Sequence, residues 1–338
     1  MSVRVGIAGT GWVGLARHLP SFRSHDRAEV VAVYDRDPAR ADEVARQRGV
    51  PFADADVDTF LGRGLDIVSI ATPPWTHADL AARSLASGAH VFTEKPMAMD
   101  TTEAEAMVAA AEASDRLLCV SHNFLFSRAV REARTFLGGA PAIYAAGVQM
   151  SSLRRRLPTW YRELPGGLLF DEMPHLIYLL QGFLGPLRVE HVRRSEAGSL
   201  DASAVEVLLA GARGPGQLTM ILDTPVSEWQ IVLVTTRGVV ALDLFRDIVV
   251  RIGPDREHKA LDILRTSAKA VADHATGFVG SGARFVRGRL FWGHDVLIRS
   301  FVDAVIDGRP SPVTPEAALG VVRVADAILA GLEASNGR

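Results

Sequence analysis

The sequence predicts an α/β protein with a doubly wound parallel sheet at the N-terminal end, followed by an α+β domain with an open, largely antiparallel sheet. Its 338 residues exceed the usual size of a single compact core, which favours two domains. Short strand-like runs alternate with helical patterns up to residue 122, and longer strand-like runs dominate from about 189 to 252. We therefore expect one domain over 1–122 and a second over 123–338.

Five short runs, rich in β-branched residues, predict the strands of the first domain: Val3–Gly9, Glu29–Asp35, Asp66–Thr72, His90–Glu94 and Leu117–His122. Helical patterns lie between them at 38–49, 76–88 and 101–115. The last two have a threonine near the start, where it can cap amides, and the first two end in glycine. Strands that alternate with helices and are buried on both faces form parallel sheets.

The second domain shows a different pattern. A helix is predicted over about Arg128–Leu137, and strand-like runs follow at 142–151 and between 204 and 245. Residues 254–289 interrupt them with helical spacing at Leu261, Leu264, Ala268 and Val271. We expect a helical insertion that packs on its own domain or covers a site, with a membrane-surface role as the alternative. Helices near 295–307 and 315–334 complete the chain.

Composition excludes several classes of protein. The 37 basic and 39 acidic residues nearly balance, so a nucleic-acid partner is not expected. The basic run Arg154-Arg155-Arg156 is expected at the surface, with an anionic contact as the alternative. Cys119 is the single cysteine, which rules out an internal disulfide and a cysteine metal cluster. Neither a membrane span nor a charged and apolar leader is apparent, so we expect a cytoplasmic protein.

A glycine-rich motif follows the first predicted strand and opens a helix. It consists of Gly9, Thr10, Gly11, Trp12, Val13 and Gly14. In this context its glycines permit a tight turn, a close approach of the backbone to a pyrophosphate, and packing of the helix on the strand. Amides at the start of the helix then hold the anion. A purely structural turn is the alternative.

Further residues at strand ends are expected to contact the nucleotide. Asp35 ends the second strand, where an acid can bond a ribose 2′-hydroxyl, which favours NAD, although Arg36 beside it leaves NADP possible. The third strand ends in a stiff loop that can lie against the nucleotide, and a histidine follows one turn into the next helix. These residues are Ala71, Thr72, Pro73 and His77.

Two groups of residues suggest chemistry. Glu94, Lys95 and Pro96 end the fourth strand, so Lys95 points from a strand end as a general acid, a general base or a hydrogen-bond donor. Asp171 and His175 are four residues apart and can share one face of a helix, where they can orient a hydroxyl and exchange its proton. The alternative is that Asp171 caps that helix, which Pro174 makes less favourable.

These motifs, in this order, resemble those of the Gfo/Idh/MocA family of oxidoreductases over nearly the whole chain. The resemblance implies a Rossmann domain and an open-faced second domain whose sheet forms a homodimer or homotetramer. It implies hydride transfer at a nicotinamide without a metal, with Lys95, Asp171 and His175 acting on the substrate hydroxyl or carbonyl. Which of Lys95 and His175 is the principal acid–base stays open.

The resemblance also suggests contacts outside these motifs. Family members often have Asn-x-Arg-Phe after the fifth strand, whereas this chain has Asn123-Phe124-Leu125-Phe126, so Arg128 or the arginine run would replace the missing arginine. Asn123 is expected at the substrate. Glu94, Lys95, Trp160 and Arg162 are expected at the cofactor.

The expected function is an NAD(P)-dependent oxidoreductase acting on a secondary alcohol or ketone of a sugar, a cyclitol or a sugar derivative. Two alternatives follow from the same residues. One is a cofactor-binding regulator without redox turnover. The other is an NAD-dependent lyase or hydrolase in which the substrate is transiently oxidised.

Overall fold

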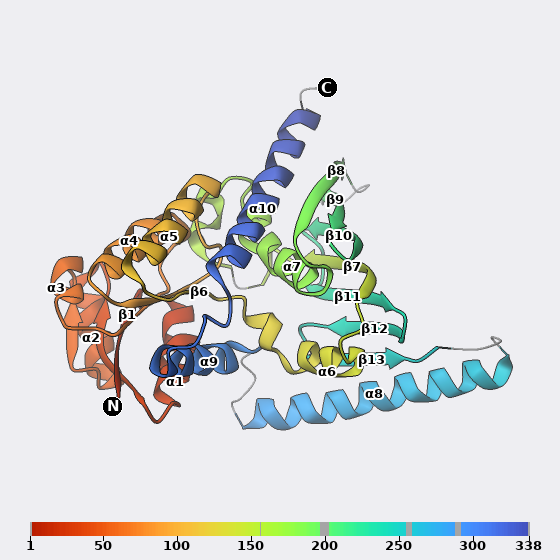
Figure 1. Ribbon diagram of the computed structural model, residues 1–338, viewed down its shortest axis with the longest axis horizontal. Helices are drawn as coiled ribbons and strands as arrows, with labels where there is room; N and C mark the ends of the chain where they lie inside the picture. Colours follow the sequence, from red (N-terminus) through yellow and green to blue (C-terminus); the bar gives the residue numbers. More distant parts are fainter. Residues whose placement is uncertain (1, 156, 197–202, 255–258, 288–291, 337–338) are drawn as a thin grey trace. The chain divides into compact units, whose positions relative to one another are not determined.

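The computed structural model describes residues 2–155, 157–196, 203–254, 259–287 and 292–336 (Figure 1). The chain divides into two compact units. The first unit comprises Met1–Asn123 and His294–Arg323, and the second comprises Phe124–Gly293 and Val324–Arg338. Arg156, the last residue of the basic run, lies outside the described residues.

Residues 2–123, all of them described, form a six-stranded parallel sheet in the order β3-β2-β1-β4-β5-β6. The strands are β1 (Val3–Ala8), β2 (Ala28–Tyr34), β3 (Phe52–Asp54), β4 (Ile67–Ile70), β5 (His90–Thr93) and β6 (Leu118–Val120). Strand order reverses between β1 and β4, which is where doubly wound sheets bind ligands. The predicted doubly wound sheet is confirmed, and β3 is a strand that the sequence analysis missed.

Helices connect these strands. They are the π-helical turn η1 (Gly14–His18), α1 (Leu19–Arg23), α2 (Pro38–Arg48), α3 (Val57–Leu61), the 3₁₀ turn η2 (Pro74–Thr76), α4 (His77–Ala86) and α5 (Thr101–Ser114). The 3₁₀ turn η3 (Asn123–Phe126) follows β6 and leads into the second unit. Asp100, and not a threonine, caps α5 by accepting a hydrogen bond from the Glu103 amide at 2.8 Å. Thr76 precedes α4, but its hydroxyl donates to the Pro73 carbonyl instead of capping the helix.

The first unit also contains α9 (His294–Asp307) and the start of α10 (Pro315–Asn336). The sequence analysis assigned these residues to the second domain. Their apolar side chains explain the difference, because Phe301 is fully buried and its ring lies 5.7 Å from that of Phe92 on β5. Long-range packing of this kind leaves no local signal in the sequence.

The described part of the second unit holds a seven-stranded sheet in the order β13-β12-β11-β7-β10-β9-β8. Its strands are β7 (Ala142–Ser151), β8 (Leu187–Glu196), β9 (Ser203–Gly211), β10 (Gly214–Leu222), β11 (Glu228–Thr235), β12 (Gly238–Asp243) and β13 (Ile248–Ile252). The predicted, largely antiparallel sheet is confirmed. One pair departs from it, because β7 and β10 run parallel with Ala145 opposite Gly216.

Four further helical segments belong to the second unit: α6 (Arg128–Leu137), the 3₁₀ turn η4 (Thr159–Glu163), α7 (Leu168–Leu184) and α8 (Ala260–Val286). α7 covers β7 and β10, where Gly147 leaves room for Leu176. α8 is the predicted helical insertion and packs beside β13 (Figure 1). None of the helices in the described part of the chain has the length and apolar content needed to cross a membrane.

His122 follows β6 and is almost completely buried. Burial lowers its pKa to about 3, although the nearby charge of Glu94 opposes this shift. Between about pH 6.5 and about pH 3 the folded chain therefore holds a neutral imidazole where an exposed histidine would be charged.

We predict that His122 makes the fold less stable in mild acid. Below pH 6.5 the unfolded chain binds a proton that the folded chain does not, which costs up to about 1.4 kcal/mol of unfolding free energy per pH unit. Urea unfolding at pH 7.5 and 5.5 measures this loss. The loss is expected to be smaller in His122→Asn, and an equal loss in both proteins would contradict the assignment.

Candidate functional site

In the glycine loop after β1, the packing of the chain leaves no room for a side chain at two positions, Gly9 and Gly14. Gly9 has a φ of +96°, and a Cβ there would lie 2.6 Å from the Ala71 carbonyl oxygen. A Cβ at Gly14 would lie 2.3 Å from the Gly9 oxygen. Gly11 differs, because its nearest neighbour would be the Ala71 oxygen at 4.0 Å. The chain leaves this space beside Gly11, which fits the close approach of a nucleotide pyrophosphate.

The start of the following helix lies beside this space. Trp12 and Val13 form its first residues, and the Trp12 side chain is exposed with the Arg17 guanidinium 4.7 Å from its ring centre. Backbone amides at a helix start favour anions. The arrangement therefore suits a phosphate group beside Gly11.

Asp35 is tied to the glycine loop at the end of β2. Its Oδ2 accepts hydrogen bonds from the Thr10 amide, at 3.1 Å, and from the Thr10 hydroxyl. Arg40 of α2 also bonds Thr10, donating to its hydroxyl and its carbonyl oxygen, each at 2.9 Å. Arg36 is exposed. The cation beside the predicted ribose-binding acid is thus Arg40, which the sequence analysis missed. Its position in the first turn of α2, shortly after Asp35, could have identified it from the sequence.

His77 joins two strand-end loops. Its Nδ1 lies 2.8 Å from the Pro96 carbonyl oxygen and its Nε2 lies 3.0 Å from that of Thr72. Burial lowers the pKa of His77, and the hydrogen bonds with the Pro96 and Thr72 carbonyl oxygens oppose this shift. Pro73 and Ala71 lie half-buried in the same loop. Within the chain His77 acts as a brace, and its predicted cofactor contact stays a prediction.

Glu94 is a buried carboxylate at the end of β5. Its Oε1 lies 2.9 Å from His18 Nε2, its Oε2 accepts from the Lys95 amide at 3.2 Å, and His294 lies 3.8 Å away. Ser69 bonds the other nitrogen of His18 at 2.8 Å. Burial opposes ionisation of Glu94, but the hydrogen bond and charge of His18 outweigh it and lower the pKa of the carboxyl group. Glu94 therefore holds the strand end in place.

Lys95 follows directly on this fixed carboxylate. Its side chain is half-buried, whereas the neighbouring Glu94 and Pro96 are buried, and the Lys95–Pro96 peptide bond is cis. Two buried neighbours thus fix the backbone of Lys95. Asn123, also predicted at the substrate, is buried at the end of the same unit.

In the second unit, α7 carries both Asp171 and His175. The helix begins at Leu168 after Gly167, whose φ is +59°, and the Asp171 amide already donates to the Gly167 carbonyl at 3.4 Å. Asp171 therefore lies inside the first turn, and the alternative that it caps the helix is wrong. Asp171 and His175 are 7% and 9% exposed, so both are largely buried.

Aromatic side chains surround His175. Its Nδ1 lies 2.9 Å from the Tyr178 hydroxyl, which also accepts a hydrogen bond from the Phe124 amide at 3.3 Å. The rings of Phe124 and Trp229 lie 5.4 and 4.9 Å from the imidazole. The sequence analysis missed these three residues. Tyr178 could have been found by its i+3 spacing from His175, whereas Trp229 is on β11 and has no local signal.

Arg155 belongs to the arginine run that was expected, with Arg128 as the other candidate, to replace the arginine absent after β6. It pairs with the buried carboxylate of Glu172, the neighbour of Asp171, to which Gln149 also donates at 2.7 Å. Burial lowers the pKa of Arg155, and the charge of Asp171 opposes that shift. Arg128, the other candidate, instead bonds Glu132 and the Asp247 carbonyl oxygen.

The turn η4 carries the two remaining predicted cofactor residues. Trp160 is half-buried, and Arg162 is exposed, with its Nε 3.3 Å from the Tyr161 hydroxyl. Their cofactor contacts stay predictions.

We predict that two glycines of the loop respond differently to the same substitution. Gly11→Ala is expected to weaken NAD binding at least about tenfold, because the added methyl group would occupy space that the pyrophosphate needs. It is not expected to lower the melting temperature, because the nearest protein atom to the added Cβ is 4.0 Å away. Gly14→Ala is the matched control and is expected to lower the melting temperature, because its Cβ meets the Gly9 oxygen. Calorimetric titration and thermal unfolding measure both effects. Unchanged NAD affinity in Gly11→Ala would contradict the pyrophosphate site.

Comparison with known proteins agrees with this geometry. Residues 3–122 match an oxidoreductase family with an NAD-binding Rossmann fold. UDP-N-acetylglucosamine 3-dehydrogenase from Acidithiobacillus ferrooxidans is 32% identical over 189 residues, 53% of this chain and 55% of the relative. The NADP⁺-dependent scyllo-inositol 2-dehydrogenase from Bacillus subtilis is 32% identical over 186 residues, 52% of this chain and 56% of the relative. The chain thus spans about half the length of these curated relatives.

A solved structure extends the likeness to the whole fold. The WlbA dehydrogenase from Bordetella pertussis, in complex with NADH and UDP-GlcNAcA, has a TM-score of 0.78 at 17% identity and covers 99% of this chain and 96% of its own. At this identity the likeness concerns the fold alone. The match to the family model covers the nucleotide-binding domain: over residues 3–122 the chain resembles the Gfo/Idh/MocA oxidoreductases, which have an NAD-binding Rossmann fold.

Proposed function

We propose that the chain is an NAD(P)-dependent oxidoreductase that acts on a secondary alcohol or ketone of a sugar, a cyclitol or a sugar derivative. The observation that carries the proposal is the Asp171–His175 pair on α7, buried in an aromatic setting, in a chain whose first domain matches an NAD-binding oxidoreductase family. The relatives named above as UDP-sugar and inositol dehydrogenases support the substrate class.

The residues that would hold the cofactor lie at the carboxyl ends of the parallel strands. The loop from Gly9 to Gly14 would bind the pyrophosphate, Asp35 would bind the adenosine ribose, and the loop around Thr72 would lie against the nucleotide. The bound nicotinamide supplies a hydride acceptor or donor. Arg40 beside Asp35 would pair a 2′-phosphate, which keeps NADP possible.

In the second unit, His175 would exchange the substrate proton. Because its Nδ1 bonds the Tyr178 hydroxyl, we assign the exchange to Nε2. The Tyr178 hydroxyl both donates and accepts hydrogen bonds, so it can support either tautomer of the imidazole as the proton moves. Asp171, one turn earlier on α7, would orient the substrate hydroxyl.

Lys95, which belongs to the first unit, would act on the substrate hydroxyl or carbonyl oxygen. Its place beside the fixed Glu94 limits its backbone freedom, which suits a group that must hold one position. As an ammonium, Lys95 stabilises negative charge on the oxygen, and as an amine it accepts the proton. We propose that Lys95, Asp171 and His175 act on one substrate.

Self-association and location complete the proposal. The sheet face opposite α7 exposes Leu208 and Val232, which share a row across the sheet with Gln217 and Ala146. An apolar face of this kind supports a homodimer or homotetramer through the sheet.

The lone buried thiol of Cys119 is consistent with a reducing compartment, and we keep a cytoplasmic location as a proposal.

We predict that Lys95→Ala lowers turnover at least about 100-fold, because a positioned acid–base group typically contributes that much. The NAD dissociation constant is expected to stay within about twofold, since Lys95 would supply only one of many nucleotide contacts and the glycine loop would supply the main ones. Nicotinamide absorbance with UDP-N-acetylglucosamine and scyllo-inositol as probes gives the rate. Lys259→Ala is the matched control and should behave as wild type. Full turnover in Lys95→Ala would remove Lys95 from the mechanism.

A further inference from the structure

The long helix α8 turns its apolar side chains away from the unit to which it belongs. The outward residues include Leu261, Leu264, Val271, Phe278 and Phe285, which are 66–75% exposed. Val279 and Val286 beside them are 66% and 85% exposed. A helix on the surface of a globular unit normally shows the opposite orientation, with its apolar stripe facing the core. The exposed face therefore requires a different explanation.

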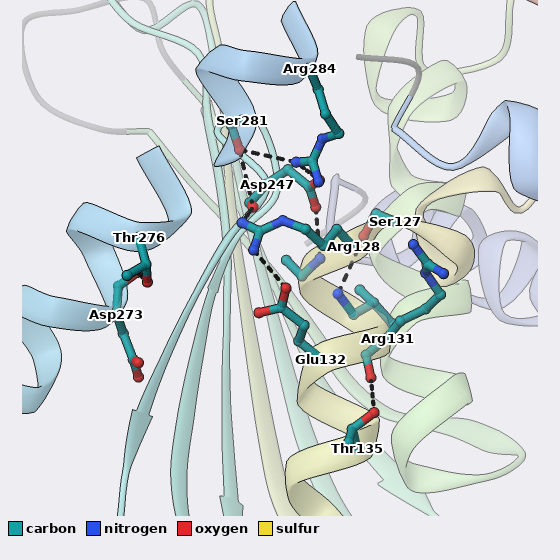
Figure 2. A network of polar contacts seen from close by, with 12 residues as sticks. Ser127, Arg128, Arg131, Glu132, Thr135, Asp247, Asp273, Thr276, Ser281 and Arg284 are labelled. Atoms are coloured by element: carbon teal, nitrogen blue, oxygen red, sulfur yellow. Dashed lines mark hydrogen bonds and ion pairs between the residues drawn. The ribbon is translucent and has the colours of Figure 1, made fainter. Parts of the chain in front are cut away.

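The inward face of α8 is polar and is held in place by specific contacts. Arg284 donates to the Asp247 carboxylate at 2.7 Å, and Ser281 donates to the Arg246 carbonyl at 2.7 Å. Figure 2 shows these side chains extending from α8 towards Asp247. The guanidinium of Arg128 on α6 also donates a hydrogen bond to the backbone carbonyl oxygen of Asp247. At Gly277 a Cβ would lie 3.0 Å from Ile248, so the helix approaches β13 closely.

A second anchor fixes the middle of α8. Asp273 accepts hydrogen bonds from the Arg251 side chain at 2.7 Å and from Lys269. Burial opposes the ionisation of Asp273, but these hydrogen bonds outweigh it and lower its pKa to about 2. Removing one member of such a buried pair is costly, so α8 cannot readily roll its apolar face inward.

The outward residues repeat with the spacing of a coiled coil. Leu261, Ala268, Ala275 and Gly282 form one set at intervals of seven, which we call the small set. Leu264, Val271, Phe278 and Phe285 form a second set, three residues further on, which we call the large set. Together they alternate in steps of three and four over four heptads, the pattern that packs one helix against another.

The sizes of the two sets select an antiparallel partner. In a parallel pair of identical helices the large set would meet itself and the small set would leave voids. In an antiparallel pair related by a twofold axis near residue 273, each member of the large set meets a member of the small set, as Phe278 meets Ala268 and Val271 meets Ala275. The one bulky member of the small set, Leu261, meets Phe285 at the end of the contact. The small set and the large set together form what we call the heptad stripe. Arg265 lies beside this stripe near one end of α8, so the two copies of this cation would lie far apart.

The exposed area is sufficient for such a contact. A phenylalanine side chain offers roughly 150–250 Å², and the exposed parts of the seven large outward residues amount to on the order of 800 Å² per copy. One partner of a stable protein–protein interface contributes about 800 Å². A membrane surface would require neither the heptad spacing nor the alternation of sizes, and it favours helices with a basic polar face, whereas the polar face of α8 is bound to its own sheet.

We propose that α8 pairs antiparallel with α8 of a second copy of this chain, burying the heptad stripe around a twofold axis near Asp273. The contact is separate from the sheet face proposed above for self-association. It does not depend on the proposed enzymatic activity.

The first test compares two glutamate substitutions on α8. Phe278→Glu places a charge in the stripe, and sedimentation equilibrium is expected to give half the wild-type mass. Ile263→Glu is the control, because Ile263 is 47% exposed on the same helix but lies outside the stripe, and its mass should equal that of wild type. Wild-type mass in Phe278→Glu would overturn the proposal, whether or not the sheet face also associates. So would a monomeric wild type that binds anionic phospholipid vesicles.

The second test determines the direction of pairing. Cysteines at Ala272 or Arg265 lie on the same side of the stripe, but only Ala272→Cys would lie beside its copy across the proposed axis. The two Arg265→Cys residues would lie about 24 Å apart along the helices, at a rise of about 1.5 Å per residue. A short bifunctional maleimide should therefore cross-link Ala272→Cys and spare Arg265→Cys. Native Cys119 is buried, which raises the pKa of its thiol to about 12, so it does not react. Equal cross-linking of both variants, or of neither, would overturn the antiparallel arrangement.

Discussion

The buried contact between His18 and Glu94 is the interaction on which the first unit's candidate site depends. A carboxylate taken out of water must be paired, and the 2.9 Å contact with His18, itself held by Ser69, supplies the partner. This pairing joins the glycine-loop helix to the ends of β4 and β5. His77 adds a second brace between the loops at Thr72 and Pro96. Lys95 therefore projects from a region in which nearly every neighbour is fixed.

In the second unit, the same need of a buried polar group for a partner governs the helix α7. α7 is buried along most of its length, which makes the two polar residues Asp171 and His175 costly unless they are hydrogen-bonded or used. Tyr178 satisfies one nitrogen of the imidazole, and Phe124 and Trp229 exclude water from its faces. Arg155 neutralises the neighbouring Glu172. A preorganised proton-transfer group in a dry setting is what hydride transfer from an alcohol requires.

Local patterns predicted most of the first sheet, because periodicity and glycine spacing are local signals, and the Gly9–Gly14 loop is formed as its motif implied. Residues joined by distant packing were missed, including Trp229 beside His175, and the return of α9 to the first unit could not be read from its own sequence. Helical spacing in α8 was visible, but the side facing outward depends on partners such as Asp247 on another element. The sequence analysis placed Asp171 correctly on its helix. Only the structure showed that Asp171 lies inside the first turn and does not cap the helix.

Hydride transfer between a sugar-like alcohol and the nicotinamide is the central claim, and isotopic labelling tests it most directly. A substrate probe such as UDP-N-acetylglucosamine or scyllo-inositol, deuterated at its carbinol carbons, is incubated with the protein and oxidised cofactor. Mass spectrometry of the reduced cofactor is expected to show one deuterium per turnover. Conversion of the substrate with no deuterium in the cofactor would contradict the account.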